Sequence, residues 1–454
     1  MAVLPLSCGE PAAAFRALAG EPWSMLLDSA ARGDARGRWS YIVADPVGTV
    51  EAVDGTTLVD GVPVPGDPFT ALERALAALA PAGGAIGGGP APFVGGAVGF
   101  IGYEAGRRLD LPVSRHANPG GEPELAFGLY DAVAAFDHAS GRAWVAAARP
   151  EAAARARRLA ARLEAAPPSP GPLPPAAAWR SELTRAAYRE GVERVLAYIR
   201  AGDIYQANFT QRFLAQPPAG LDPYALYERL RVLNPAPFAA YLHCGPRLRI
   251  ASASPERFVR LDADGRIETR PIKGTRRRHA DPVADAAAAA ELVASVKDRA
   301  ENLMITDLLR NDLGRVARIG SVRVPVLYGL ESFATVHHLV SVVTATLRPG
   351  LGPVDLLRAA CPGGSITGAP KIRAMEIIDE LEAARRGAYC GSVAWIGVDG
   401  AMDSSIVIRT LSLTPDAVVA RAGGGIVADS DPDAEHDEMM VKVRPLLRSL
   451  EDDP

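Results

Sequence analysis

A proline-rich tract near the middle of the chain most constrains how it can fold. Residues 166–178 contain the run Pro-Pro-Ser-Pro-Gly-Pro-Leu-Pro-Pro, which can form neither a helix interior nor a central strand. Residues 151–165, just before it, are Ala, Arg, Leu and Glu with helical character. We therefore expect residues 148–180 to be a linker between an N-terminal segment, residues 1–147, and a second domain, residues 181–450.

Strand patterns are frequent on both sides of this tract, at residues 40–44, 125–130, 143–146, 238–243 and 248–252. Helical patterns occur at residues 183–201, 285–309 and 372–384. Many of the strands are not separated by crossover helices. The pattern therefore favours an α+β protein with mostly antiparallel sheets and helices packed outside, over a doubly wound parallel sheet.

Composition narrows the class of protein. The net charge of -4 over 454 residues is small and of mixed sign, which argues against electrostatic binding to nucleic acid or to an anionic membrane. No run approaches the ~20 apolar residues of a membrane span, and the N-terminus lacks the pattern of a signal peptide. The four cysteines, Cys8, Cys244, Cys361 and Cys390, have neither metal-type nor disulfide-type spacing. We expect a cytoplasmic protein with reduced thiols.

One amine stands out at residues 270–276, Arg-Pro-Ile-Lys-Gly-Thr-Arg, where Lys273 lies in a small and apolar stretch beside a glycine. A lysine held in such surroundings is desolvated, becomes partly neutral and can attack carbon. The alternative, from these residues alone, is a strand end at which Lys273 caps a turn or reaches water.

Two pairs of carboxylates have helical spacing. Asp298 and Glu301 are three residues apart, as are Glu435 and Glu438, so each pair lies on one face if its segment is a helix. If the two faces meet, they offer hard oxygen ligands that suit Mg²⁺. The alternative is two solvated helix faces.

Glycine-rich segments predict the approach of a small anion. Residues 361–372, Cys-Pro-Gly-Gly-Ser-Ile-Thr-Gly-Ala-Pro-Lys-Ile, precede a predicted helix whose N-terminal amides can receive a carboxylate. They lack the spacing of a nucleotide-binding Walker loop. Residues 422–426 hold three consecutive glycines that let a backbone approach a ligand, or form a tight turn. His337 and His338 supply either an acid or base or a structural residue.

Together these blocks resemble the chorismate-utilising enzymes, the family of anthranilate, aminodeoxychorismate and isochorismate synthases. The blocks that carry the resemblance are residues 201–208, 254–256, 270–275, 300–314, 336–341, 362–377, 404–410 and 423–442. The N-terminal segment resembles component I of this family at residues 26–29, 38–46 and 95–104. The resemblance implies two large, mostly antiparallel sheets that form a sandwich with helices outside.

Within the family, a few side chains point to one branch. Anthranilate synthases usually carry alanine at the position of Lys273, whereas the aminodeoxychorismate branch carries this lysine. Asn302 also resembles that branch, and Gln206 stands where isochorismate synthases place a lysine base. The resemblance implies that Lys273 adds to C2 of chorismate as the C4 hydroxyl leaves, and that ammonia then enters at C4. Glu256 would be the acid, unless it only pairs with Arg257, and His338 would support catalysis.

The resemblance also implies the remaining site residues. Mg²⁺ would be held directly by Glu301 and Glu438, with Asp298 and Glu435 in an outer shell; Asp298 departs from the glutamate that the family often has. Chorismate would be surrounded by Gly274, Thr275, Thr367, Tyr389, Arg409, Gly423, Gly425 and Lys442. A tryptophan pocket would be formed by Ser29, Arg38, Trp39, Ser40, Tyr41, Pro237, Phe238 and Ala239. Tryptophan would bind there in a structural role, bind there in a regulatory role, or not bind.

The predicted function is thus Mg²⁺-dependent amination of chorismate at C4, for 4-aminobenzoate and folate synthesis. No glutaminase unit is visible in the sequence, so the resemblance implies a separate glutamine amidotransferase subunit that forms a heterodimer and delivers ammonia. Two alternatives stay open. One is component I of an anthranilate synthase, and the other is a non-catalytic subunit that binds chorismate or tryptophan and regulates a partner.

Overall fold

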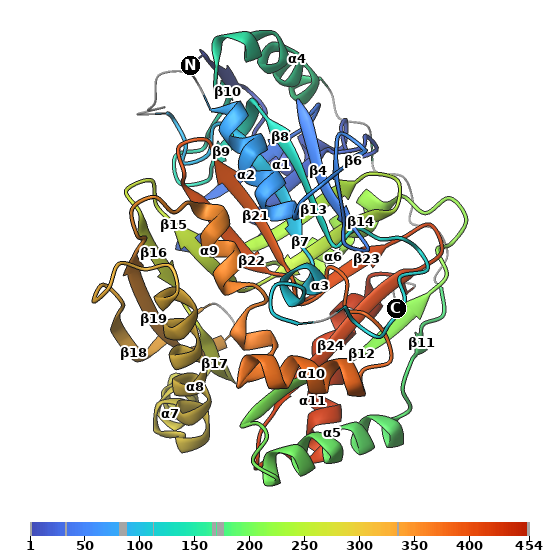
Figure 1. Ribbon diagram of the computed structural model, residues 1–454, viewed down its shortest axis with the longest axis vertical. Helices are drawn as coiled ribbons and strands as arrows, with labels where there is room; N and C mark the ends of the chain where they lie inside the picture. Colours follow the sequence, from blue (N-terminus) through green and yellow to red (C-terminus); the bar gives the residue numbers. More distant parts are fainter. Residues whose placement is uncertain are drawn as a thin grey trace.

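A computed structural model describes residues 2–31, 34–80, 89–111, 113–165, 169, 177–333 and 336–451. Within these ranges the chain forms two large sheets in which every paired strand is antiparallel, with helices on their outer sides (Figure 1). The predicted α+β class and the mostly antiparallel pairing are therefore confirmed.

The first sheet begins with β1 near the N-terminus and includes the long antiparallel pair β12 and β24. In the order β1-β10-β9-β3-β2-β13-β14-β23-β24-β12-β11, with β20 beside β12, its strands are β1 (Ala2–Leu6), β10 (Arg142–Ala147), β9 (Ala132–Asp137), β3 (Trp39–Val43), β2 (Met25–Asp28), β13 (Phe238–Cys244), β14 (Leu248–Ser254), β23 (Thr410–Leu413), β24 (Val418–Ile426), β12 (Gln206–Ala215), β11 (Arg180–Ser181) and β20 (Gly368–Ala369).

The second sheet holds the strand with Lys273 at one edge. In the order β17-β19-β16-β15-β22-β21-β7-β8-β4-β5-β6, with β18 beside β19, its strands are β17 (Ile272–Arg277), β19 (Val336–Thr346), β16 (Arg266–Thr269), β15 (Arg257–Leu261), β22 (Met402–Ile406), β21 (Ser392–Gly397), β7 (Gly96–Ile101), β8 (Leu125–Tyr130), β4 (Gly48–Val53), β5 (Thr56–Val59), β6 (Val62–Val64) and β18 (Arg323–Ser332).

The helices cover the outer sides of both sheets. They are α1 (Pro11–Phe15), α2 (Pro68–Leu79), α3 (Tyr103–Arg107), α4 (Ala153–Glu164), α5 (Arg185–Arg200), α6 (Pro223–Leu233), α7 (Pro282–Ala294), α8 (Val296–Gly314), α9 (Pro353–Ala360), α10 (Lys371–Leu381) and α11 (Pro432–Arg448), with 3₁₀ turns η1 (Ala35–Gly37), η2 (Pro150–Ala152) and η3 (Gly364–Ile366). Helices α4, α5, α6 and α11 pack on the first sheet, and α2, α7 and α8 pack on the second. None of the helices within the described ranges is long and apolar enough to cross a membrane.

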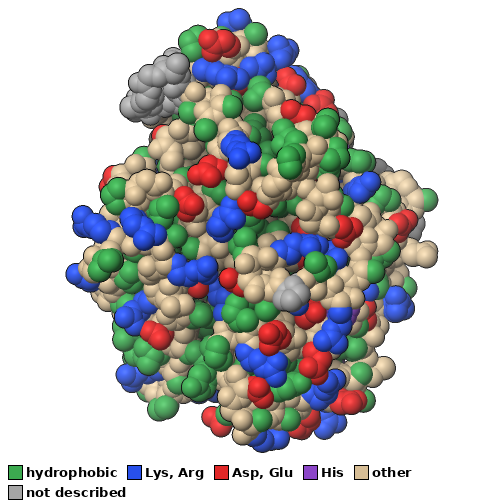
Figure 2. Space-filling view, in the orientation of Figure 1, with side chains coloured by type: hydrophobic (Ala, Val, Ile, Leu, Met, Phe, Trp, Pro, Cys, Tyr) green, Lys and Arg blue, Asp and Glu red, His purple; other side chains and the backbone are tan. Residues whose placement is uncertain are grey.

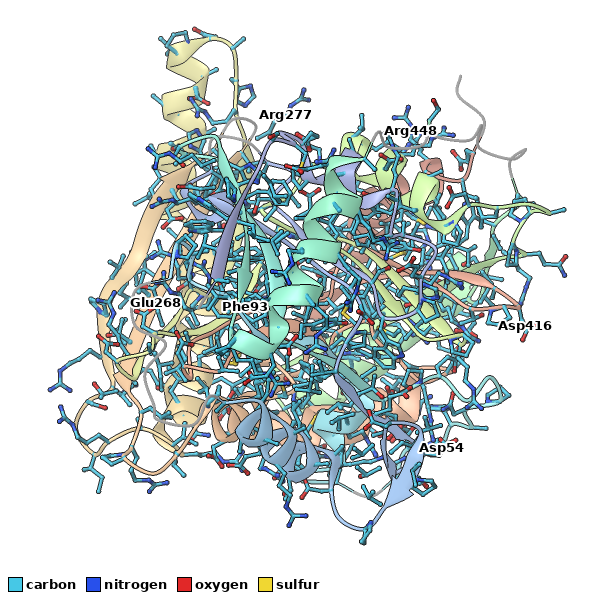
Figure 3. The ribbon with its side chains drawn as sticks, turned by 90° about the horizontal axis from the view of Figure 1, so that it is seen from above. Asp54, Phe93, Glu268, Arg277, Asp416 and Arg448 are labelled. Atoms are coloured by element: carbon cyan, nitrogen blue, oxygen red, sulfur yellow. The ribbon has the colours of Figure 1, made fainter. Side chains whose placement is uncertain are left out.

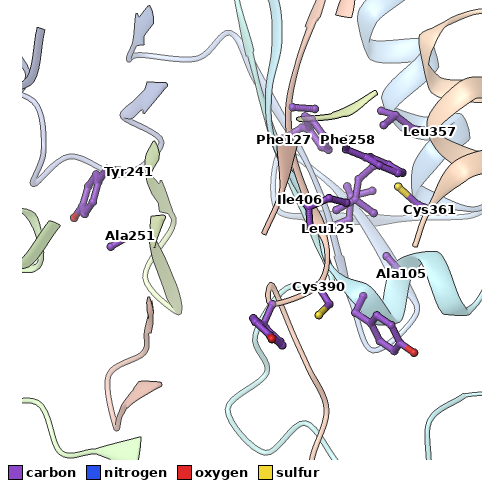
Figure 4. Close-up of a cluster of buried hydrophobic side chains, with 14 of the residues drawn as sticks. Ala105, Leu125, Phe127, Tyr241, Ala251, Phe258, Leu357, Cys361, Cys390 and Ile406 are labelled. Carbon is purple, nitrogen blue, oxygen red and sulfur yellow. The ribbon is translucent and has the colours of Figure 1, made fainter. Parts of the chain in front are cut away.

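The two sheets meet face to face across a buried apolar layer. Met25, Leu242 and Ile250 of the first sheet pack with Val98 and Phe100 of the second. Burial of such side chains is the main source of stability for a domain of this kind. A larger core lies under the helices, where Phe127, Phe258, Ile406 and Leu357 come together from four distant parts of the chain (Figure 4).

Exposed charged side chains lie over the outside of this body, although some, such as Glu104 and Arg386, are buried. Seen from above, Phe93 lies in the interior, whereas Asp54, Arg277 and Asp416 lie at the periphery (Figure 3). Cationic and anionic side chains are interspersed over the face in Figure 2, with no gathering of one sign. This distribution agrees with the mixed charge of the sequence.

Strands from both sides of the proline-rich tract share both sheets. β2 pairs with β13 in the first sheet, and β7 pairs with β21 in the second. The helix expected at residues 151–165 is α4, which packs on the first sheet. Residues 166–168 and 170–176 of the predicted linker lie outside the described residues, and the three predicted boundaries stay predictions.

One predicted helix is divided in two. The expected helix at 285–309 is broken at Ser295, which has extended backbone angles and accepts a hydrogen bond from Asp298 N through its side chain at 3.2 Å. A serine in this position caps the helix that follows. The break lets α8 begin beside the strand that carries Lys273.

Candidate active site

A cavity of about 1920 Å³ lies where β17, α8, β24, α11 and the corner between β14 and β15 meet. It is lined by most of the predicted site residues: Glu256, Lys273, Gly274, Thr275, Asp298, Glu301, His338, Tyr389, Arg409, Gly423, Gly425, Glu435, Glu438 and Lys442. The sequence separations among them are large, so the fold, and no local motif, brings these groups together.

Lys273 lies on an irregular stretch of β17. The pairing of β17 with β19 shifts register between Ile272 and Thr275, so the bulge contains Lys273 and Gly274. A bulge of this kind redirects a side chain, and Gly274 supplies the positive φ of +82°. A Cβ atom at Gly274 would lie 2.9 Å from Asp298 Oδ1. The close packing of α8 against the bulge fixes the place of Lys273.

The surroundings of Lys273 favour its neutral form. Burial lowers the pKa of this amine, and although Glu301 opposes that change, Lys442 adds to it. A lysine with a lowered pKa is the form that serves as a nucleophile near neutral pH. Lys273 can therefore act in the way that the sequence predicts.

Glu256 immediately precedes β15 and lines the same cavity as Lys273. Burial raises the pKa of the Glu256 carboxyl, while a hydrogen bond from Ser365 Oγ to Glu256 Oε1 at 3.0 Å works against this increase. A carboxyl with a raised pKa is suited to donate a proton to a leaving oxygen. Arg257, the alternative partner considered for Glu256, binds Asp403 instead at 2.9 Å.

His338 lies on β19, directly opposite Thr275 of β17. Its Nδ1 atom is 2.9 Å from Thr275 Oγ1, and its ring is 5.5 Å from that of Phe333. Burial lowers the pKa of His338, which keeps the imidazole neutral. His337 is turned away from the cavity, where it contacts Ser332 at 2.7 Å and Asp285 at 3.1 Å.

The two predicted carboxylate pairs line the same cavity from α8 and α11. Asp298 is bound by Arg276 at 3.0 Å, Glu435 by the Ser430 hydroxyl at 2.7 Å, and Glu438 by Lys442 at 2.6 Å. Burial raises the pKa of both Glu301 and Glu435. Burial acts to raise the pKa of Glu438 as well, but Lys442 and the other lysines lower it on balance.

Hard carboxylate oxygens are the donors that Mg²⁺ takes, and Glu301 has no hydrogen-bond or ion-pair partner among the described residues. The chemistry of the donor set thus fits the ion. Among all the residues that the structure describes, however, no three His, Cys, Asp or Glu side chains lie close enough together to hold a metal.

Cationic and glycine residues form the other walls. The Arg409 guanidinium has no ion-pair or hydrogen-bond partner within the described residues, and burial lowers its pKa. Lys442 Nζ donates to Gly423 O at 3.1 Å. A half-buried guanidinium without a partner is a ready site for a carboxylate, which it can hold with two hydrogen bonds.

Two features predicted to contact the substrate, Thr367 and the start of α10, do not line the cavity. Thr367 is fully buried, and its hydroxyl donates to Gly363 O at 3.0 Å, so it does not line the cavity. The helix expected to receive an anion, α10, begins at Lys371, whose amine binds Asp312 at 2.6 Å. Instead, the preceding loop reaches the cavity through Ser365 and Ile366.

Among the residues that line the cavity without having been predicted, Ser365 and Lys297 bear on its chemistry. Ser365 lies in the glycine-rich segment, where its small polar side chain was a usable signal. Lys297 lines the cavity and lowers the pKa of Glu438, together with Lys442 and Lys273. Asn302, predicted to mark the branch, is buried and does not line the cavity; its side chain donates to Leu339 O at 3.1 Å and ties α8 to β19.

A second, smaller cavity of about 490 Å³ lies beside the first. Seven of the eight residues predicted to bind tryptophan line it: Ser29, Arg38, Trp39, Tyr41, Pro237, Phe238 and Ala239. The eighth, Ser40, lies behind the wall and accepts a hydrogen bond from Ser29 N at 3.0 Å. Arg36, Pro237, Arg257 and Arg260 line both cavities.

Comparisons with known proteins agree with this geometry. A family model described as a chorismate binding enzyme matches residues 24–448. The chain is 45% identical over 440 residues to aminodeoxychorismate synthase component 1 of Salmonella typhimurium, covering 95% of this chain and 93% of that protein. It is 41% identical over 462 residues to anthranilate synthase component 1 of Streptomyces coelicolor, covering 97% and 86%. The crystal structure of anthranilate synthase component I from Streptococcus pneumoniae matches with a TM-score of 0.78 and 30% identity, over 90% of this chain and 92% of that chain.

Proposed function

This chain belongs to the chorismate-binding enzyme family, and on that premise we propose that it is component I of an aminodeoxychorismate synthase. In this role it replaces the C4 hydroxyl of chorismate by an amino group. The observation that carries the proposal is Lys273, a half-buried amine with a lowered pKa on a bulged strand, in one cavity with the carboxyl of Glu256.

The reaction begins with Lys273. Its Nζ lone pair forms a bond to C2 of chorismate, the ring double bonds shift, and the C4–O bond breaks. Glu256 gives its proton to the departing oxygen, which leaves as water. Ammonia then forms a bond to C4, the double bonds shift back, and the C2–N bond to Lys273 breaks. The new ammonium group returns a proton to Glu256, so that both side chains are restored.

Binding of the dianionic substrate rests on Arg409, Lys442 and the backbone of Gly423 and Gly425. Arg409 is the partner for one carboxylate, because its guanidinium is half-buried and unpaired within the described part of the chain. His338, neutral and fixed by Thr275, lies beside the reacting ring.

Glu301 and Glu438 would hold Mg²⁺, with Asp298 and Glu435 behind them. When bound, the ion neutralises a substrate carboxylate next to these side chains and so permits an anion to approach four acidic groups. Lys442 binds Glu438 and Arg276 binds Asp298, so two of these four carboxylates have a cationic partner.

Ammonia would come from a separate glutamine amidotransferase subunit that pairs with this chain. We place the product in the synthesis of 4-aminobenzoate and folate in the cytoplasm. Relatives named component 1 support the existence of a second component.

The test uses the purified chain with chorismate, Mg²⁺ and excess ammonium at mildly alkaline pH, so that no partner is needed. Mass spectrometry should detect a non-aromatic product in which NH₂ has replaced OH. Fluorescent anthranilate together with pyruvate would refute the proposal in favour of the anthranilate branch, for which the 41% identity to a Streptomyces coelicolor anthranilate synthase is the supporting observation. A lack of any turnover would favour a non-catalytic binding subunit.

We further propose that the smaller cavity binds tryptophan. Its walls carry Trp39 and Tyr41, stacked with ring centroids 6.3 Å apart, and Phe238 beneath the Arg257 guanidinium at 5.1 Å. Aromatic walls of this kind accept an indole ring. Calorimetric titration with L-tryptophan tests this, with Ser29→Tyr as the variant that fills the cavity. Equal binding by the variant would refute the assignment.

A further inference from the structure

The motif at residues 95–104 in the N-terminal segment lies next to the large cavity, although none of its residues lines it. Residues 96–101 form β7, at the middle of the second sheet, and α3 follows at once. Glu104, the second residue of α3, is only 5% exposed. The chemistry proposed above gives this buried carboxylate no role.

The Glu104 carboxylate binds the backbone of a segment that leads into the cavity. Its Oε1 accepts a hydrogen bond from Arg386 N at 2.8 Å, and its Oε2 accepts one from Gly387 N at 2.9 Å. Tyr103 N adds a bond to Gly387 O at 2.9 Å. Two residues after Gly387 comes Tyr389, which lines the cavity near Arg409. Both carboxylate oxygens therefore hold the start of the segment that leads to Tyr389. In Figure 4, Ala105 marks the segment that carries Glu104, and Cys390 marks the segment that it holds.

The side chain of the same Arg386 reaches two further parts of the wall. Its guanidinium donates to Ile366 O at 2.8 Å and to Asn208 O at 2.6 Å, and it forms a buried ion pair with Glu382. Ile366 and Asn208 both line the cavity. Arg386 thus joins three lining segments, and Glu104 holds its backbone in place.

We propose that Glu104 is a positioning residue for the chorismate site, acting through Arg386 and Gly387 on Tyr389, Ile366 and Asn208. The inference rests on the proposed function only in taking the large cavity as the chorismate site. Burial raises the pKa of Glu104, and the backbone N–H groups of Arg386 and Gly387, which donate to its carboxylate, oppose that rise. By this route the N-terminal segment forms part of the substrate site without touching the substrate.

The test compares Glu104→Gln with two controls. Glutamine keeps the shape and one acceptor but places an NH₂ group against a backbone N–H, so one of the two bonds is lost. Tyr103→Phe is the matched control, since the buried Tyr103 hydroxyl has no hydrogen-bond partner among the described residues. Asp131→Asn is the stability control: Asp131 is 1% exposed and paired with Arg149 and Arg155, but it lines neither cavity.

Two readouts separate positioning from general destabilisation. In Glu104→Gln, the KM for chorismate should rise by about threefold to tenfold, with a smaller change in kcat, the effect expected for one lost hydrogen bond. Hydrogen exchange followed by mass spectrometry should be faster in the peptide containing residues 386–391. Tyr103→Phe should match the wild type in both readouts, and Asp131→Asn should lower the melting temperature without changing either.

Wild-type KM and unchanged exchange at residues 386–391 in Glu104→Gln would overturn the proposal, as would an equal rise of KM in Asp131→Asn. Faster exchange at residues 386–391 does not depend on turnover. If the wild type makes no aminated product, the proposed function fails, and the exchange data together with equilibrium binding of chorismate still decide the role of Glu104.

Discussion

Ser365 donates a hydrogen bond from its hydroxyl group to Glu256 Oε1 at 3.0 Å, across 109 residues of sequence. The contact joins the loop before α10 to the corner between β14 and β15. The bond orients the Glu256 carboxyl. Burial raises the pKa of Glu256, and the bond from Ser365 limits that rise in pKa.

Replacement of Ser365 should therefore weaken catalysis more than binding. We expect Ser365→Ala to lower kcat by about tenfold, the effect of one hydrogen bond to a group that changes charge, with little change in KM. Ser365→Thr keeps the hydroxyl and is the matched control. Initial rates of product formation with ammonium check this, and equal kcat values for the alanine and threonine variants would contradict it.

Removal of the Lys273 amine should abolish the covalent step. We expect Lys273→Ala to lower turnover by about 10³-fold or more while chorismate still binds, since the residue acts on the reacting carbon. Intact-protein mass spectrometry of the wild type with chorismate and no ammonia should detect an adduct of chorismate less one water. Lys297→Ala, a second lysine of the cavity, should still form the adduct. Wild-type amination by Lys273→Ala would show that the nucleophile is another group.

The Mg²⁺ dependence of chorismate binding should reside in Glu301. Glu301→Ala should weaken chorismate binding in the presence of Mg²⁺ by more than about tenfold, because a carboxylate ligand is lost. Calorimetric titrations with Mg²⁺ and with EDTA measure the difference. Glu291→Ala is the control, since Glu291 is exposed, binds Arg276 and does not line the cavity. An unchanged Mg²⁺ effect in Glu301→Ala would exclude Glu301 as a ligand.

A buried histidine away from the site should make stability depend on pH. Burial lowers the pKa of His243 to about 4, and its Nδ1 has no partner among the described residues. In the unfolded chain the histidine has its ordinary pKa of about 6.5, so it takes up a proton at a higher pH than in the folded protein. Stability therefore falls as the pH drops from 6.5 towards 4. We expect the free energy of unfolding to lose about 2 kcal/mol from this residue between pH 7 and pH 5. Urea unfolding of the wild type and His243→Gln checks this, because the variant should lose less on acidification.

Local patterns predicted much of the secondary structure. The strand expected at 125–130 is β8, and the helix expected at 183–201 is α5, because alternation and amphipathic spacing report burial directly. The break at Ser295 was missed, since helical patterns flank it on both sides and only the capping geometry of the serine reveals it. Which strands pair across the proline-rich tract depends on long-range packing, which no local pattern records.

The sequence predicted which types of side chain line the site better than it predicted their hydrogen-bond partners. The residue types named from the sequence, an amine at 273, carboxylates on two helices and a glycine-rich strand, do meet in one cavity. The hydroxyl of Thr367 was expected to face substrate, but it donates a hydrogen bond to the backbone carbonyl of Gly363, earlier in the same turn. The role of Ser365 depends on Glu256, far away in sequence, and that of Glu104 on a segment 282 residues later.

The sharing of both sheets by early and late strands governs how the chain can assemble as it leaves the ribosome. β2 has to wait for residues 238–244 and β7 for residues 392–397 before either has the neighbours it has in the finished protein. Pairings so distant in sequence form slowly, and unpaired strand edges attract other chains. Synthesis of nearly the whole chain therefore precedes closure of the second sheet, and until then one edge of β7 is open to pairing with other chains.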